Sequence, residues 1–152
     1  MNKIIFDKIQ NRLNDKGIHY SVDTDIISLD MRISDTVGVV NIIYDVLDKG
    51  IISYATFNSK SPQEKRASIA EYLHRANYGL PYGNFEMDYS DGEIRFKLAS
   101  FFDNNSAVSN TLIDRHIYIP CFMFERYGEG LLKLLIGEGN PESLINDAEQ
   151  MS

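Results

Sequence analysis

The chain opens with a pattern that is typical of an amphipathic helix. Ile5, Ile9 and Leu13 recur every four residues, and polar side chains fill most of the positions between them. This spacing predicts a helix over 3–16. Gly17 follows, and glycine readily takes the left-handed conformation that ends a helix.

Three stretches with strand-like patterns come next. Apolar and polar residues alternate over 27–33, which predicts a strand with one buried face. The segment 37–47 is apolar on both faces in its middle, which predicts a strand that is covered on two sides. A tight turn ending in Gly50 then leads into a third predicted strand over 51–57. The three strands are expected to form an antiparallel meander.

A second helix and a hairpin follow the meander. Ser61, Pro62 and Glu64 match the capping-box pattern that starts a helix, so a helix is predicted over 61–78. The segment 85–98 alternates apolar and polar residues on both sides of a Ser-Asp-Gly turn, which predicts a β-hairpin.

The last long segment, 109–136, again has helical spacing of its apolar residues. Pro120 removes a backbone hydrogen bond and is expected to bend the helix. Gly128 and Gly130 weaken helix formation further and mark the place where a break would fall. Asn140 then starts a short terminal helix.

The predicted order of elements is αβββαββα. Strands and helices are grouped and do not alternate as in βαβ units, so the fold class is α+β, with an antiparallel sheet and helices packed mainly on one face. The length of 152 residues fits one domain spanning 1–152.

Charge and composition narrow the classes of partner. The net charge is -7 and the pI is about 4.9, which disfavours nucleic acid because binding to phosphates depends on clustered Lys and Arg. The longest apolar run, 117–124, is too short to span a membrane. The single cysteine, Cys121, and the absence of a signal-peptide pattern predict a cytoplasmic protein.

Residues suited to catalysis or metal binding are scattered along the sequence. The three histidines, His19, His74 and His116, fall in three separate segments of the chain, and no Cys-His or acidic cluster has the spacing of a metal site. We therefore expect no metal and no cofactor. We also expect no enzyme, although Asp23 and Asp25, or His116, remain the residues that an unrecognised enzyme would use.

One stretch is more specific. The segment 71–88, EYLHRANYGLPYGNFEMD, followed by DGEIRF at 91–96, resembles the YbjN-domain family, whose members are regarded as candidate regulators of bacterial sensory transduction. In that family a helix ending in Asn leads through a glycine-containing loop into a G-x-F-E strand and a DGE-x-R hairpin. The resemblance implies a fold like that of type III secretion chaperones. It carries over no catalytic residues.

The same segment supplies the candidate binding site. The loop between the second helix and the hairpin combines aromatic, amide and glycine residues, and loops on a rigid scaffold often bind partners. The candidate binding residues are Asn77, Tyr78, Gly79, Tyr82, Gly83 and Asn84.

The last long helix also suggests self-association. It is apolar most of the way round, which is typical of a helix that is central to a core or covered by a second chain. Phe122 and Phe124 are the candidate residues of a homodimer interface, and likeness to dimeric secretion chaperones points the same way.

Together these features predict a non-enzymatic regulator or chaperone-like adaptor that binds an unidentified protein in a bacterial cytosol. Two alternatives remain open: an immunity-type protein that neutralises a toxin, and the unrecognised enzyme described above.

Overall fold

The computed structural model describes residues 1–150. The helices and strands occur in the following order: α1 (Lys3–Asp15), β1 (Ser21–Asp23), β2 (Ile26–Ser34), β3 (Gly38–Val46), β4 (Gly50–Thr56), the 3₁₀ turn η1 (Gln63–Lys65), α2 (Arg66–Asn77), β5 (Asn84–Met87), β6 (Ile94–Phe101), the 3₁₀ turn η2 (Asn105–Ala107), α3 (Asn110–Leu135) and α4 (Pro141–Gln150).

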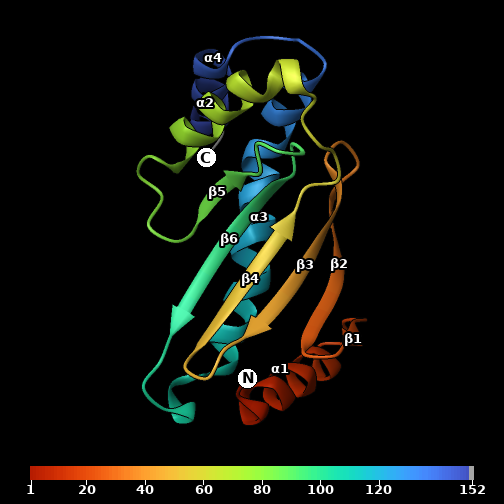
Figure 1. The fold of residues 1–152 in the computed structure, drawn as a ribbon, viewed down its shortest axis with the longest axis vertical. Helices are drawn as coiled ribbons and strands as arrows, with labels where there is room; N and C mark the ends of the chain where they lie inside the picture. Colours follow the sequence, from red (N-terminus) through yellow and green to blue (C-terminus); the bar gives the residue numbers. More distant parts are fainter. Residues whose placement is uncertain (151–152) are drawn as a thin grey trace.

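The strands form one antiparallel sheet in the order β1-β2-β3-β4-β6-β5, so the predicted fold class is confirmed. The long helix α3 runs along one face of the sheet, α1 lies at one end, and α2 and α4 lie together at the other end (Figure 1). Strand β1 was not predicted. It extends the sheet by a short hairpin whose turn contains Thr24 with a positive φ of 55°.

Burial along the strands shows which face of the sheet carries the core. Alternate residues such as Ile42, Tyr44 and Phe96 are fully buried beneath the helices. Their neighbours point to the opposite face, where Ile43 is only half-buried and Val39 is 39% exposed. The prediction that 37–47 is covered on both sides is therefore wrong, because the described helices pack on one face only.

Local signals at the end of α1 behave as predicted. Gly17 has φ of +66°, and the Ile18 N–H donates to the Leu13 carbonyl oxygen at 3.0 Å. This is the bond of the Schellman motif, which ends many helices. Arg12 donates to the Asp114 carboxylate at 2.6 Å, which connects α1 to α3.

The start of α2 differs from the prediction. Ser61 is buried, and its hydroxyl donates to the Pro62 carbonyl oxygen at 3.2 Å instead of capping a helix. A 3₁₀ turn follows, and α2 begins only at Arg66. The capping box does not form because the Ser61 backbone is bonded to the β5–β6 turn. The Ser61 N–H donates to the Gly92 carbonyl oxygen in that turn at 2.8 Å.

Helix α3 is continuous through Pro120, Gly128 and Gly130, so it does not break near the two glycines. A side chain at Gly130 would meet the Tyr72 hydroxyl oxygen at 2.2 Å, and one at Gly128 would meet the Val37 methyl groups at 2.9 Å. The glycines therefore mark places where other elements approach α3 closely. Within residues 1–150, no helix is both long enough and apolar enough to cross a membrane.

Candidate functional site

The loop between α2 and β5 is attached to the core at its first residue. The Asn77 side-chain amide donates to the Phe85 carbonyl oxygen at 2.9 Å, and its oxygen accepts from the Phe85 N–H at 2.7 Å. This pair of bonds imitates the pairing of two strands and closes the segment 78–84 into a fixed loop. Asn77 thus holds the loop in place, and its amide faces inward, away from a partner.

The other end of the loop is fixed by close packing. Gly83 has φ of +66°, and a side chain there would lie 2.6 Å from both the Lys97 carbonyl oxygen and the Phe96 ring, so only glycine fits. Phe85 is 2% exposed and packs edge-on against Phe96, with ring centroids 4.9 Å apart. The Asn84 side chain donates to the Phe85 carbonyl oxygen at 3.3 Å.

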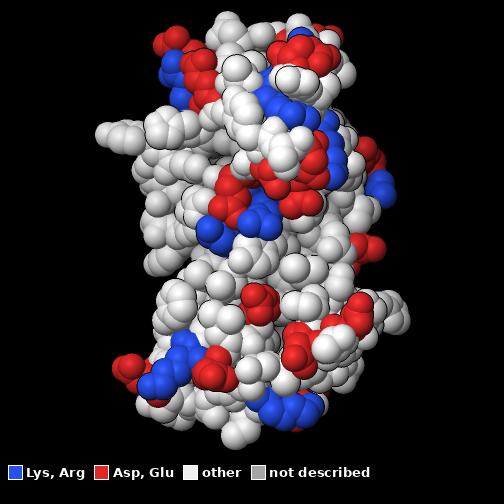
Figure 2. Space-filling model, in the orientation of Figure 1, with Lys and Arg blue, Asp and Glu red and all other residues white. Residues whose placement is uncertain are grey.

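Between these fixed ends the loop presents aromatic side chains to solvent. Tyr78 is 90% exposed and Tyr82 is 60% exposed, whereas Leu80 packs partly against the core. The loop residues 78–83 carry no charge. In Figure 2 the surface at the left, over the α2–β5 loop, is correspondingly white and projects from the molecule.

A charged cluster lies on the open face of the sheet beside this loop. Glu86 accepts from Arg95 at 2.7 Å and from Lys97 at 2.9 Å, and the Arg95 guanidinium lies 4.3 Å from the centre of the Tyr54 ring. Partial burial raises the pKa of Glu86, but the bonds from Lys97 and Arg95 outweigh it and hold the pKa below its ordinary value. The Glu86 carboxylate is therefore ionised, and its negative charge is balanced by Arg95 and Lys97.

The sequence analysis did not predict this charged cluster, although the predicted hairpin implies it. Glu86 and Arg95 are direct partners across the β5–β6 hairpin, so the Ser-Asp-Gly turn was enough to bring them together. Glu86 is the acidic residue of the G-x-F-E pattern, and Arg95 is the arginine of the DGE-x-R pattern. Within the segment that carries the resemblance, Asn77 and Gly83 hold the loop, while Tyr78 and Tyr82 provide its exposed surface.

His116 lies inside the protein and not in a cleft. It is 0% exposed, and its two ring nitrogens lie 2.9 Å from the Ser53 hydroxyl on β4 and 2.9 Å from the Ser100 hydroxyl on β6. Burial lowers its pKa to about 4, so the ring is neutral at pH 7. The side chain connects α3 to the sheet, and this geometry gives no support to His116 as an acid or base acting on a substrate.

The other groups considered for catalysis lie in two separate places, the β1–β2 hairpin and α3. Asp23 ends β1 and Asp25 lies in the following turn, both exposed at the tip of the β1–β2 hairpin. Burial raises the pKa of Cys121 to about 11, which keeps its thiol protonated at neutral pH. Across residues 1–150, no three His, Cys, Asp or Glu side chains are grouped as metal ligands.

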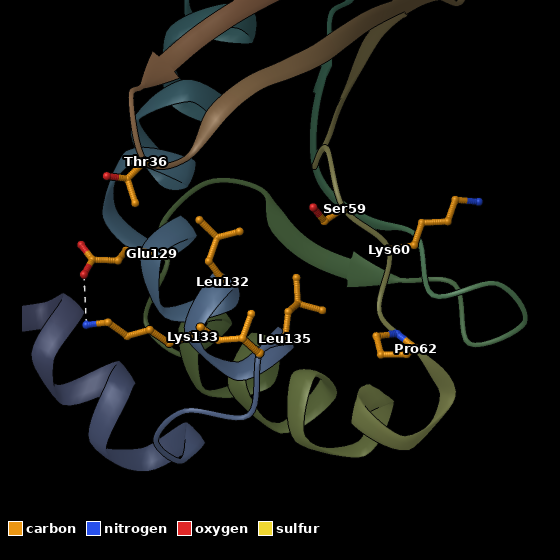
Figure 3. A pocket seen from close by; sticks show the side chains of 9 residues that line it. Thr36, Ser59, Lys60, Pro62, Glu129, Leu132, Lys133 and Leu135 are labelled. Atoms are coloured by element: carbon orange, nitrogen blue, oxygen red, sulfur yellow. Dashed lines mark ion pairs between the residues drawn. The ribbon is translucent and has the colours of Figure 1, made fainter.

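A hollow of about 430 Å³ lies between the C-terminal part of α3 and the segment that follows β4 (Figure 3). Leu132 and Leu135 point into it. Lys60 and Lys133 extend away from it in opposite directions, and they pair with Asp91 and Glu129. Small-molecule sites bring several polar groups together, and this hollow does not.

The two phenylalanines predicted at a dimer interface have opposite surroundings. Phe122 is 59% exposed on the outer side of α3. Phe124 is 0% exposed and stacks on Phe57 with ring centroids 5.4 Å apart. The assignment of Phe124 to an interface is therefore wrong, because its ring is already enclosed by the core of its own chain.

Comparisons with known proteins support the fold. No protein-family model and no curated protein matches the chain. Among solved structures, the chain is similar to that of YbjN, described as "a putative transcription regulator from E. coli", with a TM-score of 0.61 and 12% identity, over 82% of this chain and 92% of that one. The α+β fold of the resemblance is thereby confirmed, while membership of the YbjN-domain family and the likeness to secretion chaperones stay predictions.

Proposed function

We propose that the chain is a non-enzymatic regulator or adaptor that binds another protein through its α2–β5 loop. The observation that carries this proposal is the exposure of Tyr78 and Tyr82, 90% and 60%, on an uncharged loop that is held at both ends. A core-forming role does not account for these two aromatic side chains.

The physics of the loop suits protein recognition. Tyrosine offers a large contact area with a hydroxyl that can bond at the edge, and it has few rotatable bonds to immobilise. Asn77 and Gly83 already order the backbone, so binding has a smaller entropic cost than it would for a mobile segment. A fixed loop with two tyrosines can therefore act as the centre of a small interface.

The comparison with YbjN agrees with a regulatory role at the level of the fold. The net charge of -7 argues against direct contact with DNA or RNA, so regulation through a protein partner suits this chain better. A basic surface on the partner would complement the net negative charge of this chain.

Capture experiments test the proposal. The wild-type chain, the double variant Tyr78→Ala/Tyr82→Ala and the control Ile4→Ala would be used to retain proteins from the native cell, followed by mass spectrometry. Ile4 is 65% exposed on α1, at the other end of the molecule (Figure 1). Candidates that are lost only with the double variant would then be purified and titrated directly.

We expect the purified partner to bind the double variant at least tenfold more weakly than the wild type, since exposed aromatic residues are typical hot spots. Equal affinity for all three proteins would refute the role of the loop. Retention of a toxin by the wild type would identify the immunity-type alternative. Turnover of a small molecule by the purified chain would contradict the non-enzymatic assignment.

A further inference from the structure

The outer side of α3 carries a line of exposed residues, whose contacts with the rest of the protein include Lys16 Nζ, 5.1 Å from the centre of the Tyr118 ring, and the ion pair of Glu129 with Lys133. Its members follow one another in steps of three and four, and at 100° per residue they fall within about 40° of a common line. We call them the outer stripe: Thr111, Arg115, Tyr118, Phe122, Glu125 and Glu129. At its centre Tyr118 is 46% exposed and Phe122 is 59% exposed.

The stripe is arranged symmetrically about position 120. Tyr118 and Phe122 lie two residues to either side of Pro120, and Arg115 and Glu125 lie five residues to either side. A second α3 that runs antiparallel, with a two-fold axis passing between the stripes at the height of Pro120, places Tyr118 against Phe122 and Arg115 against Glu125. Pro120 itself is buried on the inner side of the helix. The symmetry makes each of these contacts occur twice.

The positions of Arg115 and Glu125 favour this register over others. A parallel arrangement would set Arg115 beside the other copy's Arg115, and an antiparallel shift of one heptad would set Arg115 beside Tyr118. The register centred on Pro120 pairs ring with ring and Arg115 with Glu125. A register centred on Phe122 would also pair two rings and would set Arg115 against Glu129, but Glu129 already pairs with Lys133 on its own helix. Within residues 1–150, neither Arg115 nor Glu125 forms an ion pair, so both charges are available to a second copy.

The surface beside the stripe can receive an aromatic ring. A shallow hollow of about 390 Å³ is lined by Tyr118, Ile119, Phe122 and Met123 together with the residues around Arg115. Its apolar lining suits the ring of a neighbouring Phe or Tyr better than a charged group. Ring burial would supply most of the attraction, while the Arg–Glu pairs select the register.

We propose that the chain forms a two-fold dimer in which the outer stripes of two α3 helices pack antiparallel about Pro120. The occupant of the stripe is a second copy of this chain, because the charge pattern is complementary to itself. This proposal is independent of the α2–β5 loop and of the partner bound there.

Sedimentation equilibrium and light scattering over a range of concentrations test the proposal. The wild type is expected to move from 17.3 kDa towards twice that mass as its concentration rises. Arg115→Glu and Glu125→Arg are each expected to weaken dimerisation about tenfold, because each reversal creates two like-charge contacts. The double reversal Arg115→Glu/Glu125→Arg restores the pairs and should return the affinity to within about twofold of the wild type.

Two further variants test the aromatic centre. Phe122→Glu is expected to abolish the dimer. Phe101→Glu, at a residue that is 73% exposed on β6 and outside the stripe, should leave the dimer intact. Circular dichroism and urea unfolding would verify the fold of each variant. Arg115→Ala or Glu125→Ala, each about threefold weaker in dimerisation, would replace a reversal that fails to fold.

Three results would overturn the proposal. The first is a wild type that stays at 17.3 kDa at every concentration, as it would if the stripe bound a different protein. The second is a double reversal that dimerises no better than the single reversals, which would exclude this register. The third is a dimer that Phe101→Glu disrupts as much as Phe122→Glu does, which would place the interface elsewhere.

Discussion

The two halves of α3 are attached to the rest of the protein in different ways. In the N-terminal half, polar groups are buried and bonded: the Tyr44 hydroxyl donates to the Ile113 carbonyl oxygen at 2.9 Å, and His116 lies between two serine hydroxyls. In the C-terminal half, the absence of side chains at Gly128 and Gly130 admits Val37 and Tyr72.

The difference teaches that one amphipathic helix can be fixed by two unrelated kinds of contact. Directional bonds in the first half depend on protonation and hence on pH. In the second half, the close approach at Gly128 and Gly130 depends on volume and tolerates no added atom, and the buried bond from the Tyr72 hydroxyl to the Tyr127 carbonyl oxygen does not depend on a group that titrates near neutral pH. Changes in the two halves should therefore differ in size, in sign and in pH dependence.

The largest effect is expected for Gly130→Ala. Helix propensity alone predicts that alanine stabilises a helix interior by about 1 kcal/mol relative to glycine. The added methyl group would instead lie 2.2 Å from the Tyr72 hydroxyl oxygen, which donates to the Tyr127 carbonyl oxygen at 2.8 Å. Displacing Tyr72 should lower the free energy of unfolding by about 3 kcal/mol, combining overpacking with a lost buried bond.

Urea unfolding followed by circular dichroism measures this loss. Gly130→Ala combined with Tyr72→Phe should cost less than the sum of the single changes, because the closest atom of the clash is removed. Glu129→Ala, at an exposed neighbouring position, is the matched control and should change stability by less than about 0.5 kcal/mol. An increase in stability on Gly130→Ala would show that Tyr72 does not approach α3 this closely.

A smaller effect, confined to the first half of α3, is expected from pH. The pKa of His116 is about 4 in the folded chain against an ordinary value of 6.5, so the unfolded chain binds a proton that the folded chain does not. The contribution to stability is complete above pH 6.5 and is lost as the pH falls towards 4. The expected loss is about 2 kcal/mol between pH 7 and pH 5.

Unfolding curves at pH 7 and pH 5 check this loss, with His116→Gln as the variant that cannot titrate. The variant should be less stable than the wild type at pH 7 but should lose less stability on acidification. Asp114 and Glu86 have lowered pKa values and also lose stability in acid, but at lower pH, and both proteins share this effect. Parallel pH dependence in the two proteins would contradict the buried, neutral state of His116.

The smallest effect concerns the start of the helices. The Ser109 hydroxyl accepts from the Leu112 N–H at 3.1 Å and caps α3, so Ser109→Ala should cost about 1 kcal/mol. Glu64→Ala should cost almost nothing, because the capping box predicted at Ser61 does not form. Comparison of the two variants by urea unfolding would contradict the structure if Glu64→Ala were the more damaging.

The sequence predicted most of the elements because their signals are local. The spacing of Ile5, Ile9 and Leu13, the positive φ available to Gly17 and the hairpin turn after Met87 act over a few residues. The short strand β1 escaped prediction because three residues are too few to show a period. Asn77 and Gly83 were predicted as part of a binding loop. In the structure Asn77 bonds to the Phe85 backbone and Gly83 packs closely against the Phe96 ring, and these partners belong to other elements.

By itself, then, the sequence determined the α+β class, the approximate bounds of the helices and strands and the region of the candidate loop, because hydrophobic periodicity and turn residues act over short distances. The tertiary structure alone decided that Phe124 is enclosed and Phe122 exposed, that His116 is neutral between two serines, and that Gly130 serves packing. Periodicity defines the faces of a helix, but what covers each face depends on residues that are far away in the chain.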